Sequence, residues 1–443
     1  MTFLDIEQKV RSLSRALQLV SLKDYEAALK AITRKLNKKY YNTPSEVDHM
    51  FIVGSVGRGT AALGESDVDV IFVLPDHVKE RFDARAGNVQ SALLQEIKSE
   101  IADRYPRTEL KGDGQVVVVD FNRFKVELVP AFNSYMRAFL HPDSNDGGKW
   151  KETFPEIEQE AVWDMQKLSQ GNYGAVCTIL RLWREVKNVH MSGFLIDSLV
   201  YDWFQSNKWD KGRITGDLSI VLTSCIVHIG RQNEWQNSWY SLGSGVAIKN
   251  PDEGLFIRKA AKFATALEEA ANSPDEMDKV FEERLGTKYD AAVNIVKGNA
   301  RAIGEQFIEE ESIIALNSLT SLDCRVTQDG FRPFSLRGWL SEVLNGNRRF
   351  LSINKSLDFF ITETAVTTPH DIKWKVRNVG EEAIRRHDER GKIMNGGIHH
   401  VENSRFTGNH YVECYIEKNG ICLSRTRIDV PINSDAIDHE HRN

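Results

Sequence analysis

The pattern of apolar and polar positions divides the chain into a mixed, largely helical part and a β-rich end. Apolar residues recur at helical spacing over residues 3–20, and helical patterns also cover residues 22–39, 154–204, 255–271 and 276–310. Short apolar runs with strand-like alternation lie between the second and third of these segments. The first three hundred residues are therefore expected to combine a sheet with many helices.

Strand patterns dominate the C-terminal end. They cover residues 357–361, 372–376, 411–416 and 421–432. The last two flank Asn419-Gly420, a pair that readily adopts the positive φ angles of a tight hairpin turn. Short alternating strands with few helices indicate a small sandwich.

A change of pattern marks the boundary between these two parts. Helical periodicity fails around residues 318–334, where Arg332-Pro333-Phe334 is typical of a linker or turn. A chain of 443 residues is expected to form two or three domains. We therefore expect an α+β fold with a mixed core and an α-helical lobe over 1–310, a linker over 311–334 and a small β-rich domain over 335–443.

Composition is that of a soluble globular protein, with 41% hydrophobic residues, 27% charged residues and a net charge of −6. The mild acidity argues against a protein that wraps long nucleic acid. No apolar run is long enough to span a bilayer, and the N-terminus lacks the apolar core of a signal peptide, so a cytoplasmic protein without membrane contact is expected. The five cysteines form no C-x-x-C pair, so buried thiols are expected rather than zinc or disulfides.

The candidate chemistry is concentrated in residues 51–74, FIVGSVGRGTAALGESDVDVIFVL. A short apolar strand precedes a turn rich in small residues, and a second strand begins at Asp67. Because side chains alternate along a strand, Asp67 and Asp69 project to the same side. Two carboxylates so close repel each other unless a cation neutralises them, and such hard oxygen ligands suit Mg²⁺ beside phosphates.

The turn before these carboxylates supplies groups that can hold a phosphate. Gly54 and Gly57 let the backbone approach a ligand, Ser55 carries a hydroxyl, and the free N–H groups of such turns bind anions. The alternative is a flexible loop followed by an exposed strand edge, which is the usual setting of an isolated D-x-D sequence. The combination with Arg58-Gly59-Thr60 and the flanking apolar strands favours the phosphate and metal site.

A third carboxylate comes from a predicted hairpin formed by residues 115–121 and 125–129. Glu127 would converge on Asp67 and Asp69 if the strands are neighbours. The three side chains would then complete a site for two metal ions, one of which activates an attacking hydroxyl. Asp120, on the other strand of the hairpin, is the competing candidate.

Three segments resemble the signature of the polymerase-β-type nucleotidyltransferases: Gly54-Ser55, Arg58-Gly59-Thr60 and Ser66-Asp67-Val68-Asp69-Val70. More closely, they look like the branch that holds oligoadenylate synthases, cyclic GMP-AMP synthase and the bacterial CD-NTases of anti-phage signalling. The resemblance implies a polymerase-β-like catalytic core and a helical lobe, a Mg²⁺ or Mn²⁺ cofactor, and ATP, GTP or other NTPs as substrates. The nucleotide-binding residues that it implies are Gly54, Ser55, Arg58 and Ser66.

The resemblance also implies the identity of the third metal ligand. The family pattern ends in a carboxylate followed by two hydrophobic residues and Pro-Ala-Phe, and Glu127 holds that place. The family usually has Asp there, so the longer side chain of Glu127 affects the expected geometry of the second metal. By resemblance, Asp67, Asp69 and Glu127 are the catalytic and metal-binding set.

A second phosphate-holding segment is implied by residues 181–194, RLWREVKNVHMSGF, which resemble the helix and turn that close over the triphosphate in CD-NTases. By that resemblance Lys187 holds the β- and γ-phosphates, with Ser192 beside it. Without the resemblance, a lysine at this position is a solvated side chain. The family often has Trp where this chain has Val186.

The β-rich end resembles a second family, the AGS-C sensor domain attached to adenylyl/guanylyl cyclases, SMODS proteins and CD-NTases. The resemblance lies in residues 374–383, 390–393 and 410–416. It implies a domain that recognises a nucleotide or another ligand, with contacts from Trp374, Arg377, Arg390 and Tyr411. The alternative is that the aromatic residues, at strand spacing, belong to the core.

Together the resemblances imply an enzyme that joins NTPs into a cyclic di- or trinucleotide second messenger, which a downstream effector reads in CBASS-like anti-phage signalling. Two other interpretations stay open. The same chemistry would make linear ribo- or deoxyadenylates, or would attach a nucleotide to a protein or tRNA. A protein of another class would bind nucleotides without catalysis and act as a sensor.

Overall fold

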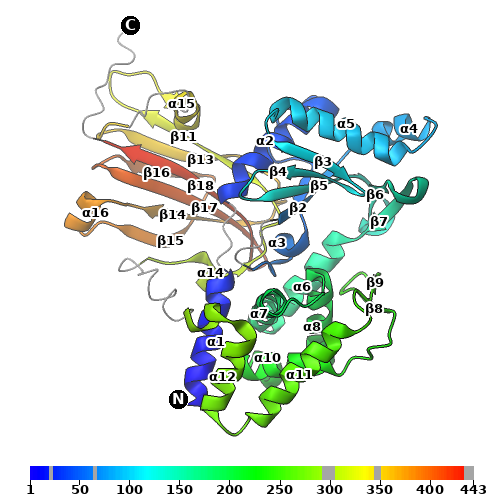
Figure 1. The fold of residues 1–443 in the computed structure, drawn as a ribbon. Coiled ribbons are helices and arrows are strands. Elements are labelled where there is room, and N and C mark those ends of the chain that lie inside the picture. The colour runs from blue at the N-terminus through cyan, green and yellow to red at the C-terminus, as the bar shows by residue number, and fades with distance from the viewer. Residues whose placement is uncertain (19–22, 63–66, 292–304, 344–350, 434–443) are drawn as a thin grey trace. The chain divides into compact units, whose positions relative to one another are not determined.

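The protein is described by a computed structural model over residues 1–18, 23–62, 67–291, 305–343 and 351–433. The chain forms two compact units, shown in the ribbon of Figure 1. The first unit contains residues Met1–Ser21, Ile52–Glu96 and Thr108–Ala300, and the second contains Leu22–Phe51, Ile97–Arg107 and Arg301–Asn443.

A seven-stranded mixed sheet carries the segment with the candidate chemistry. Its order is β1-β2-β5-β4-β3, and β6 and β7 continue it beyond β5. The strands are β1 (Met50–Ile52), β2 (Asp67–Val73), β3 (Glu109–Asp113), β4 (Val116–Asp120), β5 (Lys125–Asn133), β6 (Phe139–Asp143) and β7 (Lys149–Thr153). The helices in this part of the chain are α3 (Gly54–Arg58), α4 (Asp76–Asp83) and α5 (Val89–Arg104), with the short turns η1 (Tyr135–Arg137) and η2 (Asn145–Gly147).

The pairing of these strands decides where the acidic residues lie. β2 runs parallel to β5, and β5 runs antiparallel to β4, so the predicted hairpin of β4 and β5 is confirmed. The predicted small-residue turn contains the short helix α3, which ends at Gly59 in the left-handed conformation with φ 73°.

The helical lobe is built around α7 (Asn172–Val186), whose residues Asn172–Trp183 are all buried. Apolar side chains on every side of a helix indicate a core position. Its neighbours in the lobe are α1 (Phe3–Gln18), α6 (Pro155–Leu168), α8 (Gly193–Asn207), α9 (Lys211–Thr215), α10 (Leu218–Gly230), α11 (Leu255–Glu269) and α12 (Pro274–Leu285), with a small sheet of β8 (Ser238–Tyr240) and β9 (Ala247–Lys249). The helix predicted over 276–310 is interrupted after Leu285, because Gly286 adopts φ 72°. Residues 287–291 are helical again, and residues 292–304 lie outside the described part of the chain.

The second helix, α2 (Lys23–Tyr40), belongs to the second unit together with the segment after it. Ser45 Oγ donates to Glu363 Oε2 at 3.1 Å, and Lys30 Nζ donates to Thr426 Oγ1 at 3.4 Å. These contacts join residues about three to four hundred positions apart, which periodicity along the chain does not reveal.

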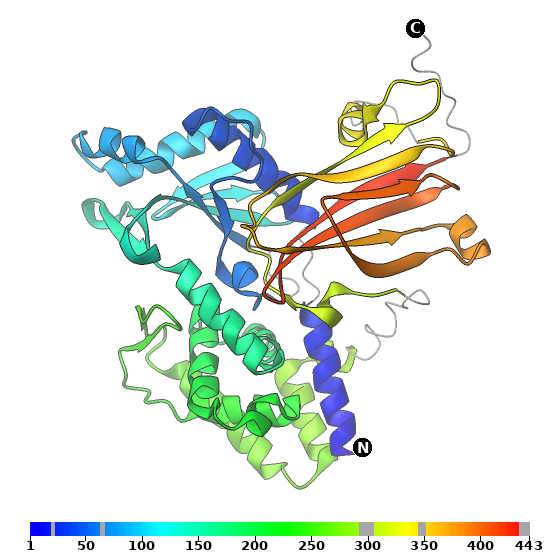
Figure 2. The same cartoon turned by 180° about the vertical axis from the view of Figure 1, so that it is seen from behind.

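The second unit contains a two-layered β-region, seen from behind in Figure 2. One sheet has the order β10 (Ile313–Ile314), β18 (Ile421–Ile432), β17 (Gly408–Lys418), β14 (Asp371–Arg377) and β15 (Arg390–Gly396). The other has the order β12 (Phe334–Ser335), β11 (Thr320–Thr327), β13 (Ser356–Thr364) and β16 (His399–Asn403). The helices of this region are α14 (Ile308–Glu311), α15 (Leu336–Val343) and α16 (Glu381–Arg385).

Buried residues from both sheets share one hydrophobic cluster, so the predicted sandwich is confirmed. The predicted hairpin turn is confirmed as well, because Asn419 and Gly420 adopt φ 54° and 75°. Residues 320–327, which the sequence pattern placed in a linker, form β11 and pair with β13.

The predicted α+β class, with a helical lobe and a β-rich C-terminal region, agrees with the structure. All five cysteines are buried thiols. Among the described helices, none has the length and apolar character that crossing a membrane requires.

Candidate active site

The small-residue turn lies against the carboxylate of Asp69. Val53 donates its backbone N–H to the Asp69 carbonyl oxygen at 2.9 Å, which ties the end of β1 to β2. Gly54 follows with φ +60°, and a Cβ atom at this position would lie 1.7 Å from Asp69 Oδ2. A side chain would therefore collide with the carboxylate, and its backbone would be strained, so glycine is required here.

Neighbouring strands bring the acidic residues together. In the parallel pair of β2 and β5, Asp69 lies opposite Glu127 and Asp67 lies opposite Lys125. Paired residues of adjacent strands face the same side of a sheet, as do alternate residues within a strand. Asp67, Asp69 and Glu127 therefore share one face, and all three line a single pocket.

Asp120, the competing carboxylate, lies farther along the same sheet. It pairs with Lys125 across β4 and β5, and its Oδ2 lies 3.7 Å from Lys125 Nζ. Lys125 is thus placed between Asp120 and Asp67 in the sheet. Asp120 is not among the residues that line the pocket, so the geometry favours Glu127 as the third acidic residue.

The pocket has a volume of about 550 Å³, and its charged residues come from two kinds of element. The strands contribute the three carboxylates described above. The opposite group consists of Arg58 from α3, Arg181, Arg184 and Glu185 from α7, and Lys288. Apart from Glu185, whose Oε2 lies 3.6 Å from Lys288 Nζ, the acidic and basic groups are thus separated, an arrangement that suits a polyanion bound together with a cation.

A buried ion cluster supports the basic side. Asp197 on α8 is fully buried, and its carboxylate accepts hydrogen bonds from Arg181 Nη1 at 2.7 Å and from Arg58 Nε at 3.0 Å. Thr60 Oγ1 donates to the same carboxylate at 2.8 Å. Burial raises the pKa of Asp197, but the charges of Arg181 and Arg58 outweigh that effect and hold its pKa below the ordinary value.

This cluster explains the position of Arg58, which the sequence assigned to nucleotide binding. The guanidinium is held by Asp197 and lies 4.8 Å from the ring centroid of Phe194, yet Arg58 still lines the pocket. Two arginines share one carboxylate, so the cluster keeps one net positive charge beside the pocket. Asp197 was not predicted from the sequence, because an aspartate inside an apolar helical pattern has no recognisable spacing to its partners.

Lys187, the cation predicted to hold the phosphates, does not line the pocket. It follows the end of α7, and its carbonyl oxygen accepts a hydrogen bond from Lys259 Nζ at 3.2 Å. Arg184, one turn earlier, does line the pocket together with Arg181. Residues three positions apart share a helix face, so the Arg181 and Arg184 spacing was the signal that could have identified this pair.

The remaining predicted nucleotide-binding residues divide into three cases. Gly54 and Ser55 line the pocket. Ser192 does not; its Oγ accepts the backbone N–H of Leu195 at 3.0 Å and caps α8, which places the adjoining Gly193 at the pocket wall. Ser66 lies outside the described residues.

The acidic side of the pocket suits a divalent cation of the Mg²⁺ type, because carboxylate oxygens are the protein ligands that such ions prefer. Across the described ranges, no three His, Cys, Asp or Glu side chains are already gathered closely enough to hold a metal ion. Mg²⁺ usually keeps several waters and binds one or two carboxylates plus substrate phosphates. The pair of Asp69 and Glu127 on adjacent strands, with Asp67 on the same face, fits that requirement without a closed cage.

In the β-rich unit, two of the predicted ligand contacts are structural. Trp374 is 1% exposed, and its Nε1 donates to the Gly397 carbonyl oxygen at 2.9 Å, as expected for a core residue. Arg377 Nη1 donates to the Glu389 carbonyl oxygen at 2.7 Å. Both side chains are therefore committed to contacts within the sandwich.

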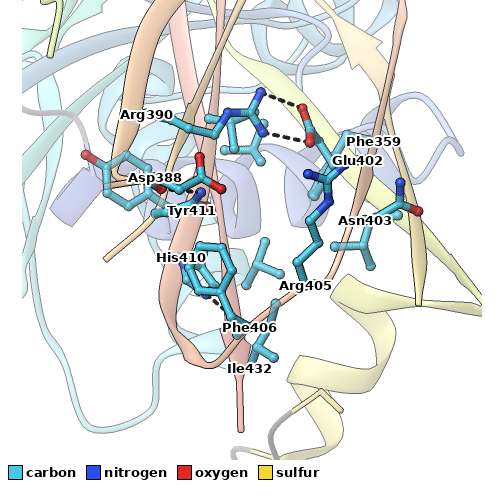
Figure 3. Close-up of a pocket in the computed structure, with 15 residues that line it drawn as sticks. Phe359, Asp388, Arg390, Glu402, Asn403, Arg405, Phe406, His410, Tyr411 and Ile432 are labelled. Atoms are coloured by element: carbon cyan, nitrogen blue, oxygen red, sulfur yellow. Dashed lines mark hydrogen bonds and ion pairs between the residues drawn. The ribbon is translucent and has the colours of Figure 1, made fainter. Parts of the chain in front are cut away.

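The other two predicted contacts lie at a second pocket. Arg390 forms two hydrogen bonds with Glu402, at 2.7 and 2.9 Å. Tyr411 carries the Arg427 guanidinium over its ring at 3.5 Å from the centroid. Both line a pocket of about 270 Å³ between the two sheets, which Figure 3 shows.

Two family models match the chain. Residues 5–165 match the Second Messenger Oligonucleotide or Dinucleotide Synthetase domain, SMODS. Residues 303–433 match the Adenylyl/Guanylyl and SMODS C-terminal sensor domain, AGS_C. The second match begins upstream of the predicted boundary and includes β11.

A curated relative and several solved structures are similar to parts of the chain. A probable cyclic nucleotide synthase of Bacillus cereus strain VD146 is 23% identical over 178 residues, which are 38% of this chain and 53% of that protein. The chain thus spans about half the length of the curated relative it matches.

One of the similar solved structures is E. coli MS115-1 CdnC with ATP, which is 16% identical, covers 64% of this chain and 98% of that chain, and has a TM-score of 0.49. Another is Vibrio cholerae DncV cyclic AMP-GMP synthase with a linear intermediate, which is 12% identical, covers 65% of this chain and 87% of that chain, and has a TM-score of 0.44. The two resemblances predicted from the sequence are confirmed by the family models. Residues 5–165 of this chain thus match a SMODS synthetase domain, and residues 303–433 match an AGS-C sensor domain.

Proposed function

We propose that the chain is a metal-dependent nucleotidyltransferase that joins NTPs into a cyclic di- or trinucleotide second messenger. The observation that carries this proposal is the pairing of Asp69 with Glu127 on adjacent parallel strands, on the face that also bears Asp67. That acidic group lies in one pocket with the glycine turn at Gly54 and with the basic residues of α7. A metal-bound triphosphate needs these three features together.

Asp67, Asp69 and Glu127 are the residues that would hold Mg²⁺ or Mn²⁺. When bound, the cation neutralises the carboxylates and lowers the pKa of a coordinated hydroxyl, which makes that hydroxyl a better nucleophile. Without a cation, three carboxylates facing one pocket would repel both one another and an incoming phosphate. The activity is therefore expected to require added divalent metal and to be lost in EDTA.

The basic residues take the other end of the substrate. Arg184 and Lys288 would bind the β- and γ-phosphates, and the Asp197 cluster holds Arg58 and Arg181 in position beside them. In the proposed reaction a hydroxyl oxygen bonds to the α-phosphorus, its proton is released, and the bond to the bridging oxygen breaks, so pyrophosphate leaves. Positioning the two groups in line is the main contribution of the protein.

Two successive transfers between two nucleotides, each using a hydroxyl of the other, would close a ring. The ring is the signal that we assign to this chain, with a downstream effector in anti-phage defence as its receptor. The Bacillus cereus relative, a probable cyclic nucleotide synthase, and the SMODS match support this assignment.

A product assay tests the proposal. The purified chain is incubated with labelled ATP, GTP, CTP and UTP and Mg²⁺, and the products are treated with phosphatase. A cyclic product has no terminal phosphate and is expected to survive, whereas a linear oligonucleotide loses its 5′-phosphates. Label recovered on protein or tRNA, or NTP binding without pyrophosphate release under every metal, would contradict the proposal.

Variants of the acidic group test the site itself. Glu127→Gln is expected to lower pyrophosphate release by about a thousandfold or more, because metal stabilisation of the transition state is worth several kcal/mol. Asp67→Asn combined with Asp69→Asn is expected to abolish it with the fold intact. The matched control is Asp120→Asn, a carboxylate of the same sheet outside the pocket, which is expected to retain turnover. The opposite result for Glu127 and Asp120 would move the third ligand to Asp120.

A further inference from the structure

Two buried glutamines of α6 contact the small-residue turn of the candidate active site, which comprises residues 54–59. Gln159 and Gln166 are each 4% exposed, and Val162 between them is fully buried. Because seven residues make about two turns of an α-helix, both glutamines lie on the same side of α6. A buried amide is costly unless it is hydrogen-bonded, so the bonding partners of these side chains indicate what this side of α6 stabilises.

Gln159 holds the chain where it leaves β1. Its Nε2 donates to the Ile52 carbonyl oxygen at 2.9 Å in a buried hydrogen bond. Ile52 is the last residue of β1, and the next residue, Val53, donates its N–H to the Asp69 carbonyl oxygen at 2.9 Å. The start of the turn is therefore fixed by both α6 and β2.

Gly57 makes the contact with Gln159 possible. A Cβ atom at this position would lie 2.4 Å from Gln159 Nε2 and 2.3 Å from the Ile52 carbonyl oxygen, which is closer than non-bonded atoms can pack. Any other residue would therefore displace the amide from its acceptor. Gly57, which was expected to let the backbone approach a ligand, instead lets α6 approach the turn.

Gln166 holds the other end of the turn. Its Nε2 donates to the Gly59 carbonyl oxygen at 3.5 Å, and its Oε1 accepts the backbone N–H of Gly174 on α7 at 3.1 Å. One buried amide thus joins the end of the turn to two helices of the lobe. The bond to Gly59 is the longer and weaker of the two glutamine contacts with this part of the chain.

The position of the turn matters because Asp69 lies directly against it. The Asp69 carboxylate occupies the space of a Gly54 side chain, with Oδ2 1.7 Å from that Cβ position. Gly54 and Ser55 line the same pocket as the three carboxylates. A displacement of about 1 Å in a group that positions substrate can lower a rate by about a hundredfold. The contacts that hold the turn therefore bear directly on catalysis.

We propose that Gln159 is a positioning residue for nucleotidyl transfer. Its amide fixes the phosphate-binding turn at the distance from Asp69 that aligns the α-phosphate with the attacking hydroxyl, and Gln166 is a second, weaker anchor. Neither glutamine is among the described residues that line the pocket, so both act through the turn and not on the substrate. The inference rests on the proposed function, because it assigns the turn to the bound triphosphate.

Gln159→Met tests the inference, since methionine has a similar length but no N–H to donate. The variant is expected to lower kcat for pyrophosphate release by about 10–100-fold, while the KM for NTP changes less than about threefold. The KM is retained because Arg184 and Lys288, which would bind the β- and γ-phosphates, do not belong to the turn. Gln166→Met is expected to lower kcat less, because its hydrogen bond to the turn is longer.

Hydrogen exchange on the same folded variant provides a readout that does not depend on turnover. The backbone N–H groups of Gly57, Gly59 and Thr60 donate to the carbonyl oxygens of Val53, Val56 and Ser55. Loss of the Gln159 bond is expected to speed their exchange by about fivefold or more, as for one buried hydrogen bond.

Gln90→Met is the matched control. Gln90 is a glutamine of α5 that is 5% exposed and does not line the pocket, so this variant is expected to retain both kcat and the exchange rates of the turn. Three results would overturn the inference: a kcat of Gln159→Met close to that of the unaltered chain, a rise in KM in place of the fall in kcat, or an equal loss of kcat in Gln90→Met. An unaltered chain that releases no pyrophosphate would contradict the proposed function instead, and the exchange measurement would still decide whether Gln159 holds the turn.

Discussion

The pocket of the first unit and the pocket of the β-rich unit each balance acids against bases, but they distribute them differently. In the first, four acidic and four basic residues line the space, and the carboxylates of the sheet are separated from the cations of the helices. In the second, two acids and two bases line the rim, and one of each forms the Arg390–Glu402 pair. Separated charges leave a strong field for a charged ligand, whereas paired charges stabilise the fold.

The Asp197 cluster is the part of the first pocket in which basic side chains are paired with an acid. Arg58 and Arg181 line the pocket and are also held by the buried carboxylate of Asp197. These two arginines therefore stabilise the fold and can also face a ligand. The two pockets thus differ in which charged side chains are paired beneath the surface and which face the cavity. Three substitutions, taken from the largest expected effect to the smallest, test that distinction.

Asp197→Ala is expected to lower the free energy of unfolding by about 3–5 kcal/mol, because two buried arginines lose their shared counter-charge. Chemical denaturation of the full chain measures the change. Asp202→Ala on the same helix is the matched control; its side chain is 63% exposed, and a change within about 0.5 kcal/mol is expected. Equal losses in the two variants would show that Asp197 is not the support of the basic side.

Arg184→Ala is expected to raise the KM for NTP by about 10–100-fold, which is the usual cost of a lost hydrogen bond to a charged group. Lys187→Ala distinguishes Arg184, which lines the pocket, from Lys187, which the sequence resemblance implied as the phosphate-holding residue but which does not line the pocket. It is expected to change the KM less than about threefold. A larger effect from Lys187 than from Arg184 would restore the original assignment of the phosphate-holding residue.

The Arg390–Glu402 pair should give a smaller, pH-dependent effect. Burial raises the pKa of Glu402, but hydrogen bonds from His400 and Arg390 outweigh it and lower that pKa to about 2 from an ordinary 4.5. The unfolded chain therefore binds more protons at Glu402 between these values, so the stabilisation is present above about pH 4.5 and is lost as the pH falls toward 2.

Thermal unfolding of the full chain at pH 6 and pH 3.5 measures this loss. The unaltered chain is expected to be more stable than Glu402→Gln at pH 6, and the difference is expected to shrink at pH 3.5. A difference in unfolding temperature that does not depend on pH would mean that the pair contributes through packing alone.

Several elements followed directly from the amino-acid sequence. The helices α1 and α2, strand β2, the hairpin of β4 and β5 and the Asn419-Gly420 turn were predicted from periodicity and turn chemistry, which depend on neighbouring residues. Asp67 and Asp69 were identified in the same way, whereas Glu127 was preferred to Asp120 because of the family resemblance. Strand alternation alone placed Asp67 and Asp69 on one face, and only the pairing of Glu127 depended on a neighbouring strand.

Contacts between distant segments were not predictable in that way. The register that places Asp69 opposite Glu127 joins residues 58 positions apart, and Asp197 meets Arg58 from 139 positions away. The choice of Arg184 over Lys187 depends on which side of α7 faces the pocket, and the second pocket is formed by residues of two different sheets. The chain by itself therefore determined its local elements and its acidic motif, whereas tertiary packing decided which charges are paired and which face a ligand, because electrostatic partners are set by distance in space and not by distance along the chain.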